Sequence, residues 1–358
     1  MDEPLNNPAD WSCPLPIKQR DKVVIGHGSG GKMTHDLIRE LFWKYLGNET
    51  ISSGNDAAVI KDLAAVPANA CLVISTDSHV VSPLFFPGGD IGRLAVCGTV
   101  NDLAMMGAQP RWLTAGFILE EGLELEILER ILASMQKAAQ EAGIKIIAGD
   151  TKVVQKGKGD GLYINTAGVG YALEGVDVSG DNAQPGDLVI LSGEVGNHGI
   201  AVLSARGELG FEATVQSDVA PLNHLVSLLL SQCQGIHVMR DPTRGGLATA
   251  LKEIANQSNA CIMIEETKIP VMPAVASACE LLGFDPLYVA NEGKLIAIVH
   301  PEDGQKALEI MRSHPAAPNA QIIGEVKSEP ARTVLLNTAI GTTRIVDMLS
   351  GELIPRIC

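Results

Sequence analysis

The sequence predicts a two-domain protein of the α/β class. At 358 residues the chain is longer than a single hydrophobic core usually supports, so more than one domain is expected. Apolar runs of strand length alternate with segments of helical periodicity, and a polar stretch rich in Gly and Pro, Glu174 to Asp187, divides them into two series. We therefore expect a loose extension at residues 1–21, an N-terminal domain at 22–175, a C-terminal domain at 186–345 and a flexible tail at 346–358.

The first domain is expected to contain strands of mostly apolar residues and two well-marked helices. Asp90 to Gly107 has almost no polar face, so we expect a buried helix there. Glu124 to Ala142 has apolar residues at helical spacing and ends at Gly143, which is typical of an amphipathic helix. The other expected elements are a helix at Met33 to Leu46 and strands at Cys71 to Ile74, Trp112 to Leu119, Ile144 to Ala148 and Leu162 to Tyr171, and a short apolar run at Lys22 to Ile25 precedes them.

The second domain repeats this alternation with fewer clear signals. Two polar turns lie beside apolar elements, Arg240 to Gly246 and Asn291 to Lys294, and are candidates for a site. The expected elements are strands at Leu188 to Ser192 and Leu295 to Val299 and helices at Pro221 to Cys233 and Gly246 to Ala255.

The composition excludes several classes of protein. A formal charge of −15 argues against a nucleic-acid-binding surface, which needs a basic footprint. The sequence has neither an apolar run of membrane-spanning length nor an apolar signal core at its N-terminus. The 7 cysteines form no CxxC pair. We therefore expect a cytoplasmic protein that binds neither nucleic acid nor membrane.

A glycine-rich loop, Gly26 to Lys32, resembles two phosphate-binding motifs but satisfies neither. Met33 stands where a P-loop requires Ser or Thr to bind Mg²⁺. The polar segment Gly47 to Gly54 stands where a dinucleotide-binding fold requires a second strand. Two interpretations stay open, a plain linker and a loop whose backbone amides at Gly28, Gly30 and Gly31 cover phosphates.

Four aspartates share a position at or near the end of a predicted buried element: Asp56, Asp77, Asp102 and Asp150. Clustered carboxylates raise one another's pKa unless a cation neutralises them. Mg²⁺ prefers a few carboxylates together with phosphate oxygens and water. The pattern therefore favours a site for a magnesium-bound nucleotide, and His79, two residues after Asp77, is the histidine most suited to a catalytic role.

Several runs then resemble one family closely. They are GHGSGGKM, GNDAAV, the block from Ser75 to Pro110, IAGDTKVV, RDPTRGGLATAL, the turn Asn291 to Gly293 and the final PRIC. In order along residues 22–358 they are similar to the HypE family of hydrogenase maturation factors, carbamoyl dehydratases within the PurM-like, or aminoimidazole ribonucleotide synthetase-like, superfamily. The proline-rich segment 1–20 has no counterpart in this resemblance.

The resemblance implies a fold and a nucleotide site. The N-terminal domain would pair its sheet with a second copy into a dimer-spanning β-barrel, and the C-terminal domain would be an α/β sandwich. ATP and Mg²⁺ would bind in a cleft near the interface. Binding would use the four aspartates, with Asp56, Asp77, Asp102 and Asp150 as metal ligands, and further contacts from Asn101, Lys152, Asp241 and Glu292.

The resemblance also implies a reaction. The thiol of Cys358 would receive a carbamoyl group from the carbamoyltransferase HypF. ATP would phosphorylate the carbamoyl oxygen, and loss of phosphate would leave a thiocyanate whose cyano group passes to iron on the HypC–HypD complex. A carboxylate or His79 could take the nitrogen proton, and Arg244 could face the cleft from the second domain.

Two other functions stay open on sequence grounds. A PurM-like kinase or synthetase acting on a free small molecule would keep the aspartates but have no use for Cys358. A non-catalytic scaffold for maturation partners would keep the tail without turning over ATP.

Overall fold

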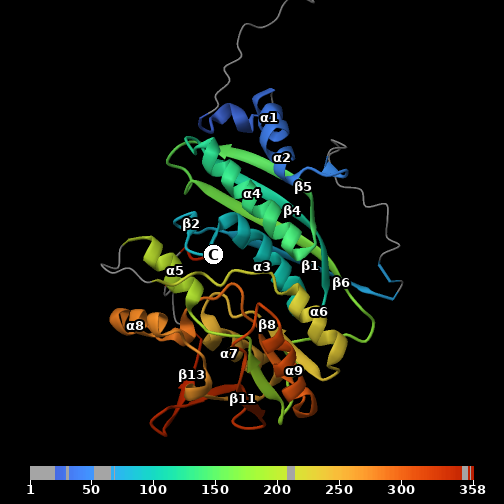
Figure 1. The fold of residues 1–358 in the computed structure, drawn as a ribbon, viewed down its shortest axis with the longest axis vertical. Helices are drawn as coiled ribbons and strands as arrows, with labels where there is room; N and C mark the ends of the chain where they lie inside the picture. Colours follow the sequence, from blue (N-terminus) through green and yellow to red (C-terminus); the bar gives the residue numbers. More distant parts are fainter. Residues whose placement is uncertain are drawn as a thin grey trace, which may run out of the picture.

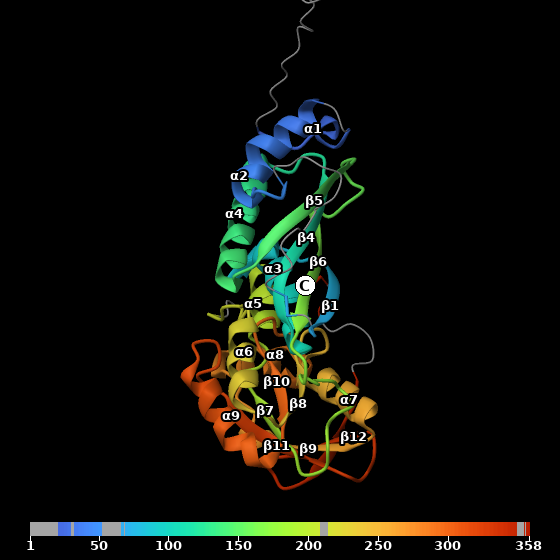
Figure 2. The same ribbon diagram turned by 90° about the vertical axis from the view of Figure 1, so that its right-hand side faces the viewer.

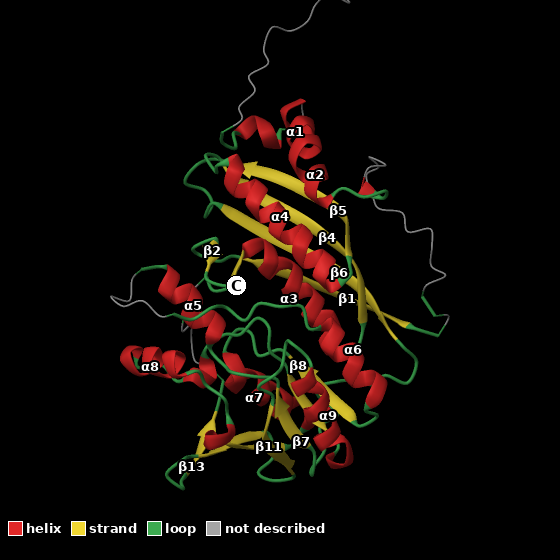
Figure 3. Cartoon of the chain, in the orientation of Figure 1, coloured by secondary structure: helices red, strands yellow, loops and turns green. Residues whose placement is uncertain are grey.

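The computed structural model describes residues 21–29, 32–51, 66–67, 69–207, 214–348, 354 and 356–358. Two sheets dominate it, one in each half of the molecule, and helices lie against both (Figures 1 and 3). The first sheet uses strands between residues 71 and 172, and the second uses strands between 188 and 346.

The N-terminal sheet has the strand order β1-β6-β4-β5. Its strands are β1 (Cys71–His79), β4 (Gln109–Glu120), β5 (Lys145–Val154) and β6 (Leu162–Ala172). Two helices, α3 (Ile91–Met105) and α4 (Leu125–Ala142), pack on one face only (Figure 2). On the opposite face Leu72 is 66% exposed and Ile74 is 71% exposed. One chain thus contributes an open sheet, and the dimer-spanning barrel would require a second copy.

Helix α3 is buried as its sequence predicts, and it connects the two halves. Asp90 caps it, accepting hydrogen bonds from Gly92 N at 2.8 Å and Arg93 N at 3.1 Å. Asn101, in the middle of the helix, donates to the carbonyls of Ala220 and Glu292 and accepts from Leu222 N. Asn101 thus has both ends of its amide bound to the backbone of the second half, and its contact with nucleotide stays a prediction.

The segment before the first sheet contains short helices and no regular strand among its described residues. Lys22 makes one isolated bridge, to Glu124, and Ile25 begins a short helix. That turn and the helical segment after it lie at the β5 edge of the sheet (Figure 1). The bounds are η2 (Ile25–Gly28), α1 (Lys32–Leu37), η3 (Ile38–Phe42) and α2 (Trp43–Leu46), and a small hairpin, β2 (Phe85–Phe86) with β3 (Gly89–Asp90), precedes α3.

The C-terminal sheet has the order β13-β12-β9-β11-β7-β10-β8. Apolar clusters cover both of its faces, one built mainly with α7 and the other with α6 and α9. The strands are β7 (Leu188–Leu191), β8 (Ile236–Arg240), β9 (Cys261–Glu265), β10 (Ile296–Val299), β11 (Gln321–Lys327), β12 (Thr333–Asn337) and β13 (Thr343–Val346). The helices are α5 (Asn197–Ala205), α6 (Asn223–Gln232), α7 (Gly246–Ser258), α8 (Pro273–Leu282) and α9 (Pro301–Ser313), with short turns η5 (Glu266–Lys268) and η6 (Pro286–Tyr288).

The end of the chain lies between the two halves, close to β2 and α5 (Figures 1 and 3). Ile354 and Ile357 are both buried there, with 7% and 6% of their surfaces exposed. We expected a tail with few contacts, and this docked position differs from that expectation. None of the helices in the described part of the chain has the length and apolarity needed to span a membrane.

Candidate functional site

Strand β1 supplies one wall of the site. It runs to His79, beyond the expected end at Ile74, because it pairs with β6 along its whole length. Alternation along the strand turns Ser75, Asp77 and His79 to the same side, toward α3. The Nε2 atom of His79 lies 3.5 Å from Oδ2 of Asp77, and Ser75 Oγ donates to Oδ2 of Asp102 on α3 at 2.7 Å.

Packing and the nearby carboxyl group of Asp77 hold His79 in place. Neither of its ring nitrogens has a hydrogen-bond partner among the described residues, although the ring is buried. Burial lowers the pKa of His79, so the imidazole is neutral at neutral pH. Gly98 of α3 leaves room for the ring, since a Cβ there would lie 3.0 Å from Cε1 of His79 and 3.3 Å from Oδ2 of Asp77.

The second half adds further carboxyl groups from the two turns singled out in the sequence. Burial raises the pKa of Asp102 to about 6 and that of Asp241 to about 7, and their mutual repulsion adds to the shift of Asp241. Glu292 is buried, and burial together with the charges of Asp241 and Asp218 raises its pKa well above the usual range. The fold thus brings Asp77, Asp102, Asp241 and Glu292 into one acidic pocket, with Arg244 close enough to favour the charged form of Asp102.

Cys358 reaches this same pocket. Burial and the neighbouring carboxyl group of Glu292 raise the pKa of its thiol far above the ordinary value, and Arg244 opposes that shift. The guanidinium group of the nearby Arg356 pairs with Asp160 at 2.9 Å.

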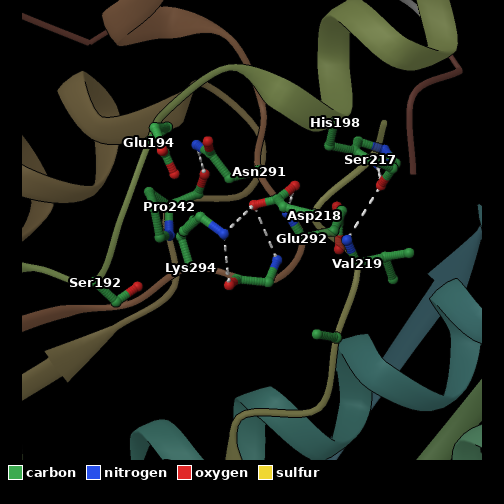
Figure 4. A network of polar contacts seen from close by, with 12 residues as sticks. Ser192, Glu194, His198, Ser217, Asp218, Val219, Pro242, Asn291, Glu292 and Lys294 are labelled. Atoms are coloured by element: carbon green, nitrogen blue, oxygen red, sulfur yellow. Dashed lines mark hydrogen bonds and ion pairs between the residues drawn. The ribbon is translucent and has the colours of Figure 1, made fainter. Parts of the chain in front are cut away.

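A buried polar network surrounds the turn that contains Glu292 (Figure 4). Asp218 accepts hydrogen bonds from the backbone N–H groups of Glu292 and Gly293, and it lies 3.5 Å from Nζ of the buried Lys294. Asn291 accepts from Gly196 N at 2.7 Å and donates to the carbonyl of Pro242 at 2.8 Å. These bonds fix the turn that carries Glu292. No sequence motif marks Asp218, which pairs with this turn from 74 residues away.

Asp150 and Lys152 belong to a different part of the surface. They form an ion pair of 3.2 Å on β5 and line two cavities. One, of about 210 Å³, also includes Gly28, Thr34 and Phe42. The other, of about 440 Å³, extends to Ser78, His79 and Asn165. This second cavity is bordered both by the β5 pair and by His79.

Three predicted site residues lie outside the described residues: Gly30, Gly31 and Asp56. Gly28 is described, and it packs tightly against β5, since a Cβ there would lie 2.6 Å from Val153 N. Within the described ranges, no three His, Cys, Asp or Glu side chains are arranged to hold a metal ion by themselves.

Comparison with known proteins identifies the family of this fold. The family model of the AIR synthase related protein N-terminal domain matches residues 54–172, and the family model of the C-terminal domain matches residues 184–337. The carbamoyl dehydratase HypE of Cupriavidus necator is 52% identical over 348 residues, which covers 97% of this chain and 98% of that protein.

The chain belongs to the HypE family of carbamoyl dehydratases.

Solved structures agree with this assignment. The hydrogenase maturation protein HypE in complex with ATP superimposes with a TM-score of 0.89 at 50% identity, covering 94% of this chain and 99% of that one. A HypE–HypF complex contains a chain that matches with a TM-score of 0.76 at 51% identity, covering 87% of this chain and 99% of that one. The resemblance to the HypE family and the PurM-like two-domain fold are therefore confirmed.

Proposed function

We propose that this HypE-family chain dehydrates an S-carbamoyl group on Cys358 to a thiocyanate, using ATP, and so supplies cyanide ligands for the iron of [NiFe]-hydrogenase. The observation that carries the proposal is the position of the Cys358 thiol, beside Glu292 and close to Arg244 and Asp77. A kinase acting on a free small molecule would have no use for a thiol held there.

The chemistry requires the carbamoyl group to lose its oxygen and two protons from nitrogen. The carbamoyl oxygen bonds to the γ-phosphorus as the bond to ADP breaks, which makes that oxygen part of a good leaving group. The C–O bond then breaks, the nitrogen lone pair completes the C≡N bond, and inorganic phosphate leaves. The two N–H protons pass to bases in the pocket.

Glu292 and His79 are the residues we assign to proton removal. Among the described residues, Oε1 of Glu292 is buried without a hydrogen-bond partner, and the Glu292 carboxyl group lies beside Cys358. Burial makes the charged form of such a carboxyl group costly, so Glu292 accepts a proton only after it has been ionised, and its ionised form is then a strong base. His79 is neutral, and its ring nitrogens make no hydrogen bond to a described residue, so it can accept the second proton. Arg244 would stabilise negative charge on the transferring phosphoryl group.

The same pocket has the character of a cation site. Asp102 and Asp241 have raised pKa values, which a divalent cation would lower again. Because the described residues contain no three-ligand cluster, Mg²⁺ bound to Asp77 and Asp102 would need phosphate oxygens to complete its shell. Asp56 and Asp150 remain candidate ligands. We assign the adenosine end of ATP to the cavities beside Lys152 and Gly28, and the phosphates to the loop that contains Gly30 and Gly31. Asp241 would then lie beside the metal and phosphates.

The proposed partners follow from the same function. HypF would load the carbamoyl group, the HypC–HypD complex would accept the cyano group, and the setting would be the cytoplasm. A second copy of the chain would cover the open face of the N-terminal sheet, where Leu72, Ile74 and Ile118 are exposed. Burial of such an apolar sheet face is a common basis for dimers.

Mass spectrometry of the intact chain tests the reaction. With HypF and a carbamoyl donor, we expect a gain of about 43 daltons, followed after ATP addition by a loss of about 18 daltons, from simple carbamoyl addition and then dehydration. Peptide mapping should place both changes on Cys358. A modified residue other than Cys358, or a gain that persists in Cys358→Ala, would favour the free-substrate enzyme.

A further inference from the structure

The carboxyl group that we assign to proton removal and the aspartate that we assign to the metal come from different halves of the molecule. Glu292 lies in a turn of the second half, between η6 and β10, and Asp102 lies on α3 of the first half. A base acts only within hydrogen-bond reach of the proton that it removes, so the two halves must be held in a fixed relation here. Two side chains, one from each half, bind the turn that carries Glu292.

Asp218 binds this turn from one side. Its Oδ1 accepts a hydrogen bond from Glu292 N at 3.2 Å, and its Oδ2 accepts one from Gly293 N at 3.3 Å (Figure 4). The two backbones approach closely, since a Cβ on Gly293 would lie 1.8 Å from the main-chain oxygen of Asp218. Nζ of the buried Lys294 lies 3.5 Å from Oδ2. Asp218 is thus the acceptor for two amides of the turn and the counter-charge for Lys294.

Asn101 of α3 binds the same turn from the other side. Its Nδ2 donates to the main-chain carbonyl of Glu292 at 3.3 Å and to that of Ala220 at 3.1 Å, and its Oδ1 accepts from Leu222 N at 2.8 Å. A primary amide can make all three bonds, because it donates twice and accepts. The N–H of Glu292 is therefore bound by Asp218 and its C=O by Asn101, so its main chain is held from both halves.

The segment that carries Asp218 is itself fastened to α3. Arg93, in the first turns of the helix, donates through Nε to the carbonyl of Val219 at 3.0 Å. Arg93 and Asn101 therefore hold the segment at two points, about 12 Å apart along the helix axis. The helix that carries Asp102 thus also places Asp218.

We infer that Asn101 and Asp218 are positioning residues that clamp the main chain of Glu292, and so hold the base from the second half in place relative to Asp102 on the first. The inference rests on the proposed function for the role of Glu292 as a base. Neither residue has to touch the substrate to act in this way. A weakened clamp should therefore slow dehydration without weakening the binding of ATP.

Hydrogen exchange of the nucleotide-free chain measures the clamp without any catalysis. Asp218→Asn keeps only one acceptor oxygen, so one of the amides of Glu292 and Gly293 loses its bond. We expect exchange at this turn to rise roughly tenfold, the size expected for one lost hydrogen bond, while exchange in α4 stays at the wild-type rate. The substitution also leaves Lys294 buried without its counter-charge, which destabilises the fold. Asp218→Asn/Lys294→Met should therefore melt at a higher temperature than Asp218→Asn and still exchange fast at the turn.

The rate constant of dehydration tests the positioning itself. Asp218→Asn and Asn101→Ala should each lower it tenfold or more at saturating ATP, because a displacement of about 1 Å can cost a hundredfold in rate. The ATP concentration that gives the half-maximal rate should stay within twofold of wild type. In a Glu292→Gln chain the same substitutions should change the rate by less than twofold, because the base that they position is gone. Asn223→Ala is the matched control, since Asn223 is also buried and donates to Ala142 O of the first half, at 2.9 Å. This variant should keep the wild-type rate.

Three outcomes would overturn the inference. Losses of rate that are as large in the Glu292→Gln chain as in wild type would show that the two residues serve only the fold. Unchanged exchange at the turn in Asp218→Asn would show that the carboxyl group does not hold it. A tenfold higher ATP requirement in Asn101→Ala, with the same maximal rate, would make Asn101 a nucleotide contact instead. A wild-type chain that never dehydrates would overturn the proposed function, and the exchange measurement would still test the clamp.

Discussion

The N–H of Val80 donates a hydrogen bond of 3.2 Å to the main-chain carbonyl of Cys358. Val80 directly follows His79, so this bond fixes the last residue of the chain in register with the residue we assign as a base. The same strand carries Asp77, a candidate metal ligand, two residues earlier. One stretch of backbone thus orients the thiol, the base and the proposed metal site relative to one another.

The buried carboxyl group beside the thiol gives the first prediction. Glu292→Gln should leave the polar turn intact, because Asp218 binds its backbone and not its side chain. Removing a general base typically costs a factor of about 10² to 10⁴ in rate. We therefore expect normal carbamoylation by HypF but dehydration slowed at least a hundredfold, measured by mass spectrometry of the intact chain. Dehydration within threefold of wild type would exclude Glu292 as the base.

Gly98 gives the second prediction. Gly98→Ala should push His79 and Asp77 out of position and lower kcat at least tenfold. The higher helix propensity of alanine should stabilise α3 by about 0.5–1 kcal/mol and so offset part of the strain in the free energy of unfolding. The matched control is Gly304→Ala in α9, where a Cβ would lie 2.4 Å from Leu188 Cδ1, far along the chain from the site. That variant should lose stability and keep its kcat. Equal losses of kcat in the two variants would contradict a specific role for the packing of His79.

Asp102 gives a prediction about pH. Its pKa is raised to about 6 in the fold, so between pH values near 4 and 6 the folded state holds a proton that the unfolded chain releases. The free energy of unfolding therefore falls as the pH rises through this window, by at most about 3 kcal/mol. Asp102→Asn does not titrate and should unfold at a higher temperature than wild type at pH 7.5 without nucleotide.

The same substitution tests the metal site. Asp102→Asn should abolish most ATP turnover in excess Mg²⁺ although the fold is stabilised, because an amide is a much weaker ligand for a hard cation. A melting temperature below that of wild type, with lost activity, would instead indicate that Asp102 serves only the structure.

Much of this molecule was readable from the sequence, for identifiable reasons. The helix predicted at Glu124 to Ala142 is α4 within one residue, because its apolar spacing is regular and Gly143 adopts the left-handed conformation that ends it, with φ of 69°. Strand β1 was predicted too short, since pairing with β6 outweighs the polar character of Ser75 to His79. The helices α5, α8 and α9 and the strands β8, β9, β11, β12 and β13 were not predicted at all.

The residues of the site were predicted from the sequence, but which of them lie together was not. Asp77, Asp102, Asp241 and Glu292 converge because α3 packs between the two halves, and no local spacing encodes that contact. Asp150 is one of the four aspartates with this pattern, yet it lies with Lys152 on the exposed β5 edge of the sheet. No sequence signal marks His198 and Arg206, because each binds a backbone carbonyl more than 100 residues away, and such contacts leave no trace in composition or motif.

Arg356 and Arg244 give contrasting predictions. Arg356→Gln and Asp160→Asn should each change the rate of Cys358 alkylation by no more than a few-fold, because their ion pair is largely exposed. Their effects should not add in the double variant, since both remove the same pair. Arg244→Gln should leave alkylation unchanged and slow ATP-dependent dehydration, because its charge faces the acidic pocket. Additive effects of Arg356 and Asp160 would show that the pair does not hold the tail.

The open face of the N-terminal sheet gives the last prediction. Ile74 is 71% exposed on β1, and in the proposed dimer the second copy covers it. A lysine there would bury an unpaired charge, so Ile74→Lys should give a monomer by light scattering at concentrations where wild type is a dimer. Leu281→Lys is the matched control, because Leu281 is 72% exposed on α8 of the other half and should keep the wild-type mass. Ile118 of the same sheet face lines, with Lys152, the cavity of about 440 Å³ that we assign to ATP. Because the second copy would cover this face, the monomer should also bind ATP more weakly. A dimeric Ile74→Lys chain would show that the sheet face is not the interface.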